Sequence, residues 1–200
     1  MPKKIDHVRK KQEIAEAAWS VILQNGLEGA TVRTIAEEAD ISVGALRYYF
    51  PTQDNLMEYA YSLIQEKISE NVGKVFQRDL SPKEKVMEIL LSLLPDGEGG
   101  RSEIEVRMAF TSHPLNKKHF DKDKDAVYAA VRNVMSNLMW SNLLKKDADL
   151  NFETERLYAL IEGMAINSMR NFEKKETAKS KKLLFYHLLS ICQEQFREMQ

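Results

Sequence analysis

Apolar side chains recur along this chain at intervals of three and four residues, and no segment sustains an alternation of apolar and polar positions. Intervals of three and four residues are typical of amphipathic helices. Alternation is typical of half-buried strands, and it is absent here. Glycine and proline are scarce, at 8 and 5 residues, and fall at breaks between the apolar stretches. The pattern predicts an all-α chain of about nine helices, with approximate bounds 8–24, 32–39, 43–49, 53–78, 82–94, 102–111, 116–145, 152–172 and 177–199.

Residues that satisfy free backbone groups mark several helix ends. Thr31, Ser42 and Ser81 stand directly before predicted helices, where a hydroxyl can accept a hydrogen bond from the first turn. Ser81 also begins a capping-box signal. Gly26 follows the first helix, a position that favours a helix C-terminus. The glycine-rich segment 95–100 is predicted to be a loop.

Residues 31–50 have the spacing of a helix-turn-helix. Each of the two helices is about seven residues long, and a four-residue turn around Asp40 joins them. Inward positions are small or aliphatic, as two short crossing helices require. The second helix turns Arg47 and small apolar groups outward, a combination that suits base edges in a major groove. On spacing alone, a plain helical hairpin within a larger bundle is an equal alternative.

The net charge argues against nucleic acid, but its distribution changes the picture. The 29 basic and 30 acidic residues give a formal net charge of −1, whereas phosphate binding favours positive charge. Residues 1–12 carry five basic groups and one acidic group, a balance of +4, and residues 13–50 carry two and six, a balance of −4. We expect the N-terminal segment to supply much of any non-specific attraction, which would be weak and strongly salt-dependent.

Composition excludes several classes of protein. The single cysteine, Cys192, rules out an internal disulfide framework and is expected to be a buried core thiol rather than a redox sensor. The four histidines form no metal-ligand pattern, and no nucleophile motif or phosphate-cradling glycine loop occurs. The longest apolar run, 89–94, is far below the ~20 residues of a membrane span. We expect a cytoplasmic protein that is not an enzyme, needs no metal or cofactor and binds no membrane.

One long motif runs from Gly26 to Pro51. It reads Gly-Leu-Glu-Gly-Ala-Thr-Val-Arg-Thr-Ile-Ala-Glu-Glu-Ala-Asp-Ile-Ser-Val-Gly-Ala-Leu-Arg-Tyr-Tyr-Phe-Pro. This resembles the TetR family of bacterial transcriptional repressors, whose pattern is glycine, Thr-x-x-x-Ile-Ala, then Ala-Gly-Val-Ser-x-Gly-x-Leu-Tyr-x-Tyr-Phe. The resemblance covers about residues 10–65. Residues 80–195 resemble, less closely, the C-terminal region of choline/betaine-repressor-like members, chiefly in Leu-Leu-Ser-Leu-Leu-Pro95 and Glu-Val-Arg-Met-Ala-Phe110.

The resemblance implies a homodimeric repressor that binds a palindromic, double-stranded operator and is released by a small-molecule effector. A three-helix DNA-binding head, with its helix-turn-helix at about 31–50, would occupy residues 8–68. A helical bundle for effector binding and dimerisation would occupy residues 69–200. By position in the motif, the DNA-contacting residues would be Thr31, Arg33, Thr34, Ser42, Val43, Gly44, Ala45, Arg47, Tyr48 and Tyr49.

Three residues depart from the family pattern. Asp40 stands where glycine is usual, and because aspartate tolerates the left-handed conformation, we expect the turn to survive. Arg47 replaces a more usual tyrosine and adds a positive charge in the groove. Gln53 replaces a common lysine near the start of the fourth helix, which weakens or removes one expected phosphate contact.

The second half of the chain holds candidates for an effector pocket. Methionine and aromatic side chains adapt to varied ligands, and two polar groups within apolar stretches could fix a polar effector. Ordinary core packing is the alternative for each of them. The pocket candidates are Arg107, Phe110, Tyr128, Met135, Met139, Trp140, Met164 and Asn167.

The last two predicted helices are apolar on more than one face. Such a helix needs partners on two sides, and a two-fold interface with a second copy would cover one of them. Burial in a larger monomeric core is the alternative. The interface candidates are Tyr158, Ile166, Met169, Leu184, Leu188 and Ile191.

The residues leave one alternative function open. Near-neutral charge and the glutamine at position 53 are also compatible with a helical effector-binding or protein-interaction bundle that binds no DNA. Binding to operator DNA is the prediction that the motif favours.

Overall fold

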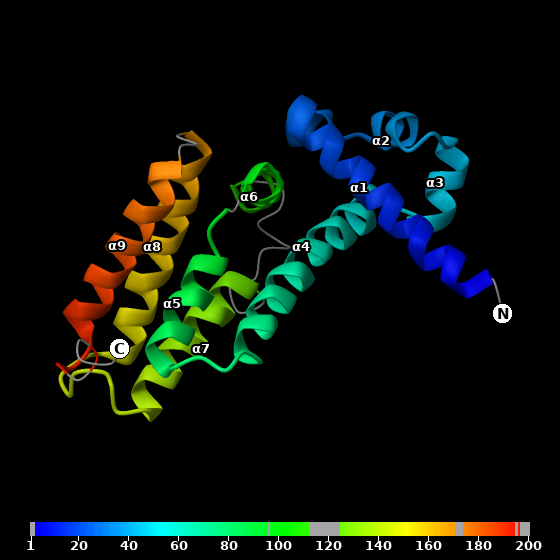
Figure 1. Ribbon diagram of the computed structural model, residues 1–200. Coiled ribbons are helices and arrows are strands. Elements are labelled where there is room, and N and C mark those ends of the chain that lie inside the picture. Colours follow the sequence, from blue (N-terminus) through cyan, green and yellow to red (C-terminus); the bar gives the residue numbers. More distant parts are fainter. Residues whose placement is uncertain (1–2, 96, 113–124, 171–173, 195, 197–200) are drawn as a thin grey trace. The chain divides into compact units, whose positions relative to one another are not determined.

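The computed structural model describes residues 3–95, 97–112, 125–170, 174–194 and 196. Within these residues every regular element is a helix, which confirms the predicted all-α fold (Figure 1). None of the described helices is long and apolar enough to cross a membrane. The helices are α1 (Lys3–Gly29), α2 (Val32–Glu38), α3 (Val43–Tyr49), α4 (Gln53–Phe76), α5 (Pro82–Ser92), α6 (Gly97–Ser112), α7 (Ala126–Trp140), α8 (Leu150–Arg170) and α9 (Lys174–Ile191).

The chain divides into two compact units. The first consists of Met1–Gln65 and Ser102–Asp121, and the second of Glu66–Arg101 and Lys122–Gln200. The boundary expected between residues 68 and 69 lies near the first division. The return of a later segment to the first unit is a feature that the sequence did not predict.

Most of α6 belongs to this returning segment. Within the first unit, the ring of Phe110 on α6 lies 5.4 Å from that of Tyr61 on α4, centroid to centroid. The helix begins at Gly97, so the prediction of a loop there is wrong. Gly100 supplies a reason, because a Cβ at this position would lie only 3.2 Å from the Cα of Pro95. At Gly100 the missing side chain allows close packing of the first helical turn against Pro95.

The first unit has an apolar core between α1, α2, α3 and the N-terminal part of α4. Trp19 of α1 donates its Nε1 hydrogen to the backbone carbonyl of Ala60 on α4, at 3.1 Å. This bond joins the first helix to the fourth. The buried side chains of this core include Ile14, Ala18, Val21, Ile22, Ile35, Ala36, Leu46, Phe50, Leu56, Ala60 and Ile64.

The two short helices begin where the sequence predicts. The hydroxyl of Thr31 accepts a hydrogen bond from the backbone N–H of Thr34 at 3.2 Å, and that of Ser42 accepts one from Ala45 at 3.0 Å. Asp40, in the turn between them, has a φ of 50°. The turn therefore keeps its left-handed residue without glycine, as expected.

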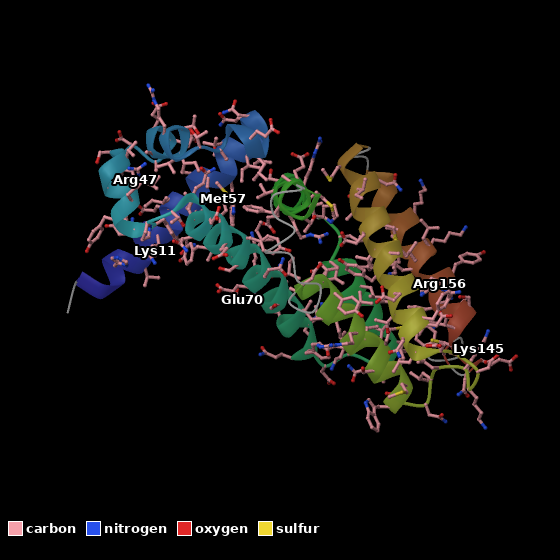
Figure 2. The ribbon with its side chains drawn as sticks, turned by 180° about the vertical axis from the view of Figure 1, so that it is seen from behind. Lys11, Arg47, Met57, Glu70, Lys145 and Arg156 are labelled. Atoms are coloured by element: carbon pink, nitrogen blue, oxygen red, sulfur yellow. The ribbon has the colours of Figure 1, made fainter. Side chains whose placement is uncertain are left out.

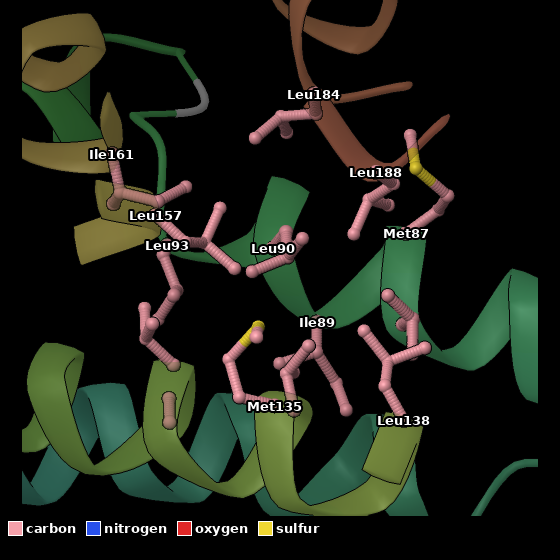
Figure 3. Packing of buried hydrophobic residues seen from close by; sticks show 14 of the residues in the cluster. Met87, Ile89, Leu90, Leu93, Met135, Leu138, Leu157, Ile161, Leu184 and Leu188 are labelled. Atoms are coloured by element: carbon pink, nitrogen blue, oxygen red, sulfur yellow. The ribbon is translucent and has the colours of Figure 1, made fainter. Parts of the chain in front are cut away.

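The second unit is built around α5. Its side chains lie between α7 on one side and α8 and α9 on the other (Figure 3). Leu90 of α5, Met135 of α7, Leu157 of α8 and Leu188 of α9 are completely buried. Removing a side chain of this size from water is worth about 1.5–3 kcal/mol, so this cluster is the main source of stability in the unit.

Two long helices are shorter than predicted. The helix expected over 116–145 begins at Ala126, because Asp125 is an extended N-cap whose Oδ1 accepts the N–H of Val127 at 2.8 Å. Residues 116–124 lie outside the described part of the chain. The same helix ends at Trp140, and the last helix, expected to reach 199, ends at Ile191.

The last helix ends early because its C-terminus pairs with the loop that follows α7. Lys145 donates its backbone N–H to the carbonyl of Ile191 at 2.9 Å, and Gln193 donates to that of Leu143 at 2.8 Å. We call this pairing the C-terminal clasp. Cys192, within the clasp, is buried, and burial raises the pKa of its thiol to about 12. The expectation of a core thiol is confirmed.

A buried carboxylate connects α7 to α8. Asp125 is only 1% exposed, and its Oδ2 accepts the hydroxyl hydrogen of Tyr158 on α8 at 2.8 Å. The ring of Tyr158 also makes an edge contact with that of Tyr128, at 5.2 Å. The hydroxyl of Tyr128 donates to Glu155, an exposed carboxylate, at 3.0 Å. The two tyrosines thus make the same bond in buried and exposed surroundings.

We expect Tyr158→Phe to lower the free energy of unfolding by about 1.5–3 kcal/mol, because it removes a hydrogen bond to a buried charge. Tyr128→Phe, the matched control, should cost about 0.5 kcal/mol, since water can replace its hydroxyl. Urea denaturation followed by circular dichroism measures both. Equal losses of unfolding free energy in the two variants would show that the buried hydrogen bond stabilises the protein no more than the exposed one.

Candidate nucleic-acid interface and C-terminal cavity

The second helix of the helix-turn-helix, α3, has one exposed face. Val43 is 37% exposed and Tyr48 is 74% exposed, and Gly44 and Arg47 are exposed beside them. These four positions span an arc of about 140° around the helix. Leu46, on the opposite side, is completely buried and fixes the helix to the head. Figure 2 labels the arginine of this face.

The other three contacts predicted at α3 and its N-cap are less accessible or already used. Ser42 is exposed, but its hydroxyl caps α3. Ala45 and Tyr49 are half-buried. Both lie outside the exposed arc of α3.

Helix α2 contributes an exposed arginine. The Nε of Arg33 lies 3.1 Å from Glu37, and both side chains are largely exposed, at 84% and 65%. Exposed pairs of this kind are worth 0 to about 1 kcal/mol, so Arg33 can exchange the carboxylate for a phosphate at little cost. Thr31 is also exposed, whereas Thr34 is half-buried and donates its hydroxyl hydrogen to the carbonyl of Gly29 at 2.7 Å.

The basic residues at the start of α1 are mostly engaged within the head. Lys10 and Arg9 both bind Glu13, at 3.0 Å, and these hydrogen bonds hold the pKa of that carboxyl below its ordinary value. The Nζ of Lys11 lies over the ring of Phe50, 5.2 Å from its centroid. Three of the five positive charges counted in the N-terminal segment therefore already have partners in the head. The segment holds less free charge than the sequence suggested.

Gln53, which stands at the position of a common family lysine, has a role inside the head. Its Nε2 donates a hydrogen bond to the carbonyl of Ala30 at 2.8 Å. The first residue of α4 is thereby tied to the corner between α1 and α2. The sequence predicted a weakened or lost phosphate contact at this position and gave no sign of the bond to Ala30.

His7 also contacts this part of the head, although no pattern in the sequence marks it. Its ring centroid lies 4.9 Å from that of Tyr49 and 6.0 Å from that of Tyr48. The two tyrosine rings are 5.2 Å apart and nearly perpendicular, at 86°. No local pattern reveals this cluster, because α1 and α3 are distant in the sequence.

The residues predicted to line an effector pocket are divided between the two units. Arg107 and Phe110, both buried, belong to the first unit, whereas the buried Met135 and Met164 belong to the core of the second. Tyr128 is half-buried. The two methionines thus pack in the hydrophobic core, which was the alternative to a pocket role.

Three of the pocket candidates are on the surface. Trp140 is 82% exposed and Met139 is 41% exposed, because α7 ends at this point, and Asn167 on α8 is exposed too. The structure corrects their assignment to a pocket.

A cavity of about 260 Å³ lies elsewhere in the second unit, among α4, α5, α7 and the loop after α7. Its polar lining comes from Lys85, Asn137 and Ser141. Lys85 donates to the carbonyl of Phe76 at 3.2 Å. In the described residues no three histidine, cysteine or carboxylate side chains gather as a metal-ligand set. The apolar lining is Phe76, Leu80, Pro82, Val86, Ile89, Val134, Leu138 and Leu143.

Half of the predicted interface side chains are in the core of the subunit itself. Leu184 and Leu188 are 0% exposed and Ile191 is 2% exposed, so none of them has surface left for a second copy. The structure corrects these three assignments. Ile166 is 41% exposed, and Tyr158 and Met169 are half-buried.

Two protein-family models match this chain. One describes bacterial regulatory proteins of the tetR family and matches residues 14–60, which include α2, α3 and the start of α4. The other describes the C-terminal part of BetI-type transcriptional repressors and matches residues 82–193. The second match alone covers more than half of the chain.

Whole-length relatives and solved structures agree with these models. HTH-type transcriptional regulator PksA of Bacillus subtilis is 45% identical over 201 residues, which cover 100% of this chain and 98% of that protein. HTH-type transcriptional regulator BetI of Proteus mirabilis is 26% identical, with coverage of 92% and 94%. A transcriptional regulator of Saccharomonospora viridis, solved in complex with choline, shares the fold with a TM-score of 0.76 at 18% identity, over 93% of this chain and 99% of that one. The chain therefore belongs to the TetR family of bacterial regulatory proteins and is a DNA-binding transcriptional regulator with a helix-turn-helix head, not an enzyme.

Proposed function

We propose that this chain acts in the cytoplasm as a homodimeric repressor that binds a roughly palindromic operator and leaves it when a small molecule binds. The exposed face of α3 is the observation that carries the proposal. A dimer would place two copies of α3 in successive major grooves, about 34–36 Å apart. Release requires that the effector bind the DNA-bound and free forms with unequal affinity.

Arg47 and Val43 would contact the base edges. An arginine can donate two hydrogen bonds to the edge of a guanine, and a small apolar side chain can contact a thymine methyl group. Both side chains are exposed on the same face of α3. Gly44 has no side chain, which lets the helix backbone approach the DNA. Arg33, on α2, is placed to contact phosphate and so to position the head.

We expect Arg47→Ala to weaken operator binding by about 1–3 kcal/mol while leaving binding to random DNA nearly unchanged. Arg33→Ala, the control, should weaken both to a similar extent and lower the salt slope by about 1. Fluorescence anisotropy at several salt concentrations measures both quantities. If the Arg47→Ala variant loses affinity equally for the two DNAs, Arg47 contacts phosphate rather than bases.

The dimer interface is proposed on the outer faces of α8 and α9. Each helix keeps exposed apolar side chains after its core face is buried. Ile166 of α8 is 41% exposed, and Leu183 and Tyr186 of α9 are 44% and 63% exposed. A two-fold interface would remove these groups from water. The proposed interface lies on the same two helices as the sequence predicted. It uses their exposed side chains in place of the buried Leu184, Leu188 and Ile191.

Ile166→Glu should convert the dimer to monomers, because it would place two carboxylates in a closely packed apolar interface. Trp140→Glu is the matched control, since it removes an equally apolar and more exposed side chain from the end of α7. Sedimentation velocity distinguishes the two states. A dimer that survives Ile166→Glu and dissociates in Trp140→Glu would move the interface to α7.

The effector is proposed to bind in the second unit, where the cavity beside α5 is a candidate site. Its lining is mostly aliphatic, with one aromatic residue, Phe76, and one cationic residue, Lys85. Quaternary ammonium ligands are recognised by several aromatic faces without a competing positive charge. The cavity thus favours an apolar molecule with a hydrogen-bonding group over choline, the ligand of the structural relative from Saccharomonospora viridis.

Choline at millimolar concentration should therefore leave the complex of this protein with its operator intact. Titration of choline into the labelled complex, followed by anisotropy, tests this expectation. The variant Lys85→Met removes the positive charge from the cavity and serves as the comparison. Release of DNA by choline from the unaltered protein would place an effector site outside this cavity.

A further inference from the structure

We propose that His7 is a positioning residue of the DNA-reading helix: by stacking on Tyr49 and contacting Tyr48, it fixes both tyrosines before DNA arrives. The proposal rests on the DNA-binding function of the head and assigns a role to a residue outside the helix-turn-helix. The relevant contacts all lie within the first unit.

The last turn of α3 needs support from another element. Helix α3 has seven residues, and its core anchors are Leu46, in the middle, and Phe50, the C-cap. Tyr48 extends from the other side, with 74% of its surface exposed. Phe50, whose backbone is extended, ends the helix directly after Tyr49. The two tyrosines thus lie at the C-terminal end of the reading helix.

His7 supplies that support from α1. Its ring centroid is 4.9 Å from Tyr49 at an interplanar angle of 46°, and 6.0 Å from Tyr48 at 72°. The tyrosines contact each other edge to face, at 5.2 Å. All three separations lie within the range of favourable ring pairs, about 4.5–7 Å. Three rings from two helices therefore form one cluster at the C-terminal end of α3, and this cluster includes the exposed Tyr48.

Ordering these side chains in the free protein favours binding. Immobilising a side chain at an interface costs conformational entropy. Rings that already contact one another lose less freedom when DNA binds. Because the cluster orients side chains next to the base-reading positions, its loss should affect the operator more than random DNA, where the fit is looser.

The experiment compares His7→Ala with His7→Phe in the full-length protein. The probe is a 30-base-pair duplex selected from a random library by the unaltered protein, and the second DNA is a scrambled duplex of the same composition. Anisotropy gives the dissociation constants. We expect His7→Ala to weaken binding to the selected duplex about 5- to 10-fold and to the scrambled duplex less than 2-fold. His7→Phe, which keeps a ring, should restore binding to within about 2-fold of the unaltered protein.

Val8→Ala is the matched control for the truncation. Val8 is the next residue of α1, is 58% exposed and belongs to no ring contact among the described residues. It should leave both dissociation constants unchanged. Circular dichroism should show both variants fully folded at the temperature of the binding assay, and a His7→Ala variant that is unfolded there would reassign His7 to stability of the head and overturn the proposal.

A double-mutant cycle separates positioning from direct contact. If His7 acts through the tyrosine that it stacks on, His7→Ala should have little further effect in a Tyr49→Ala background. Additive losses would show that His7 acts independently of that ring. Failure of His7→Phe to restore affinity, with equal losses on both duplexes, would show instead that the imidazole binds phosphate. Either result would overturn the positioning role.

Discussion

The DNA-binding surface depends on the burial of two helices that are too short to persist by themselves. Isolated helices below about 12–15 residues are marginal in water, and α2 and α3 have seven each. They are held by side chains that the core of the head removes from water, above all Ile35, Leu46 and Phe50. Every exposed residue of α3 is presented by this buried side of the same helix. Changes in the core of the head should therefore alter recognition without touching the DNA.

Local signals made the head predictable. Thr31, Ser42 and Asp40 each act within a few residues of their own position, through a cap or a turn, and the structure has them where the sequence indicates. The exposed face of α3 follows from the spacing of Leu46 and its neighbours. The bond from Gln53 to Ala30 and the ring contact of His7 join distant segments, and no periodic pattern encodes such a pairing.

The second unit was less predictable because apolar periodicity does not say which neighbour covers a face. Leu188 lies on an apolar face that the pattern detected correctly, but α5 of the same subunit covers it. The end of α9 is also set by a distant partner, the loop after α7, rather than by a residue of its own. The segment of α6 that returns to the first unit contacts it through the rings of Phe110 and Tyr61, which are distant in the sequence. These features need the three-dimensional arrangement.

The reactivity of Cys192 can be used to follow opening of the C-terminal clasp. The thiol of Cys192 is buried and protonated at neutral pH, and only a thiolate with access to solvent reacts readily with disulfide reagents. We expect the thiol to become reactive when the backbone pairing between Ile191 and Lys145 opens. The rate at which the unaltered chain is labelled thus reports how often the clasp opens. Comparing it with the rate of global unfolding tells whether the clasp opens locally. With one cysteine in the whole sequence, no other thiol contributes to the signal.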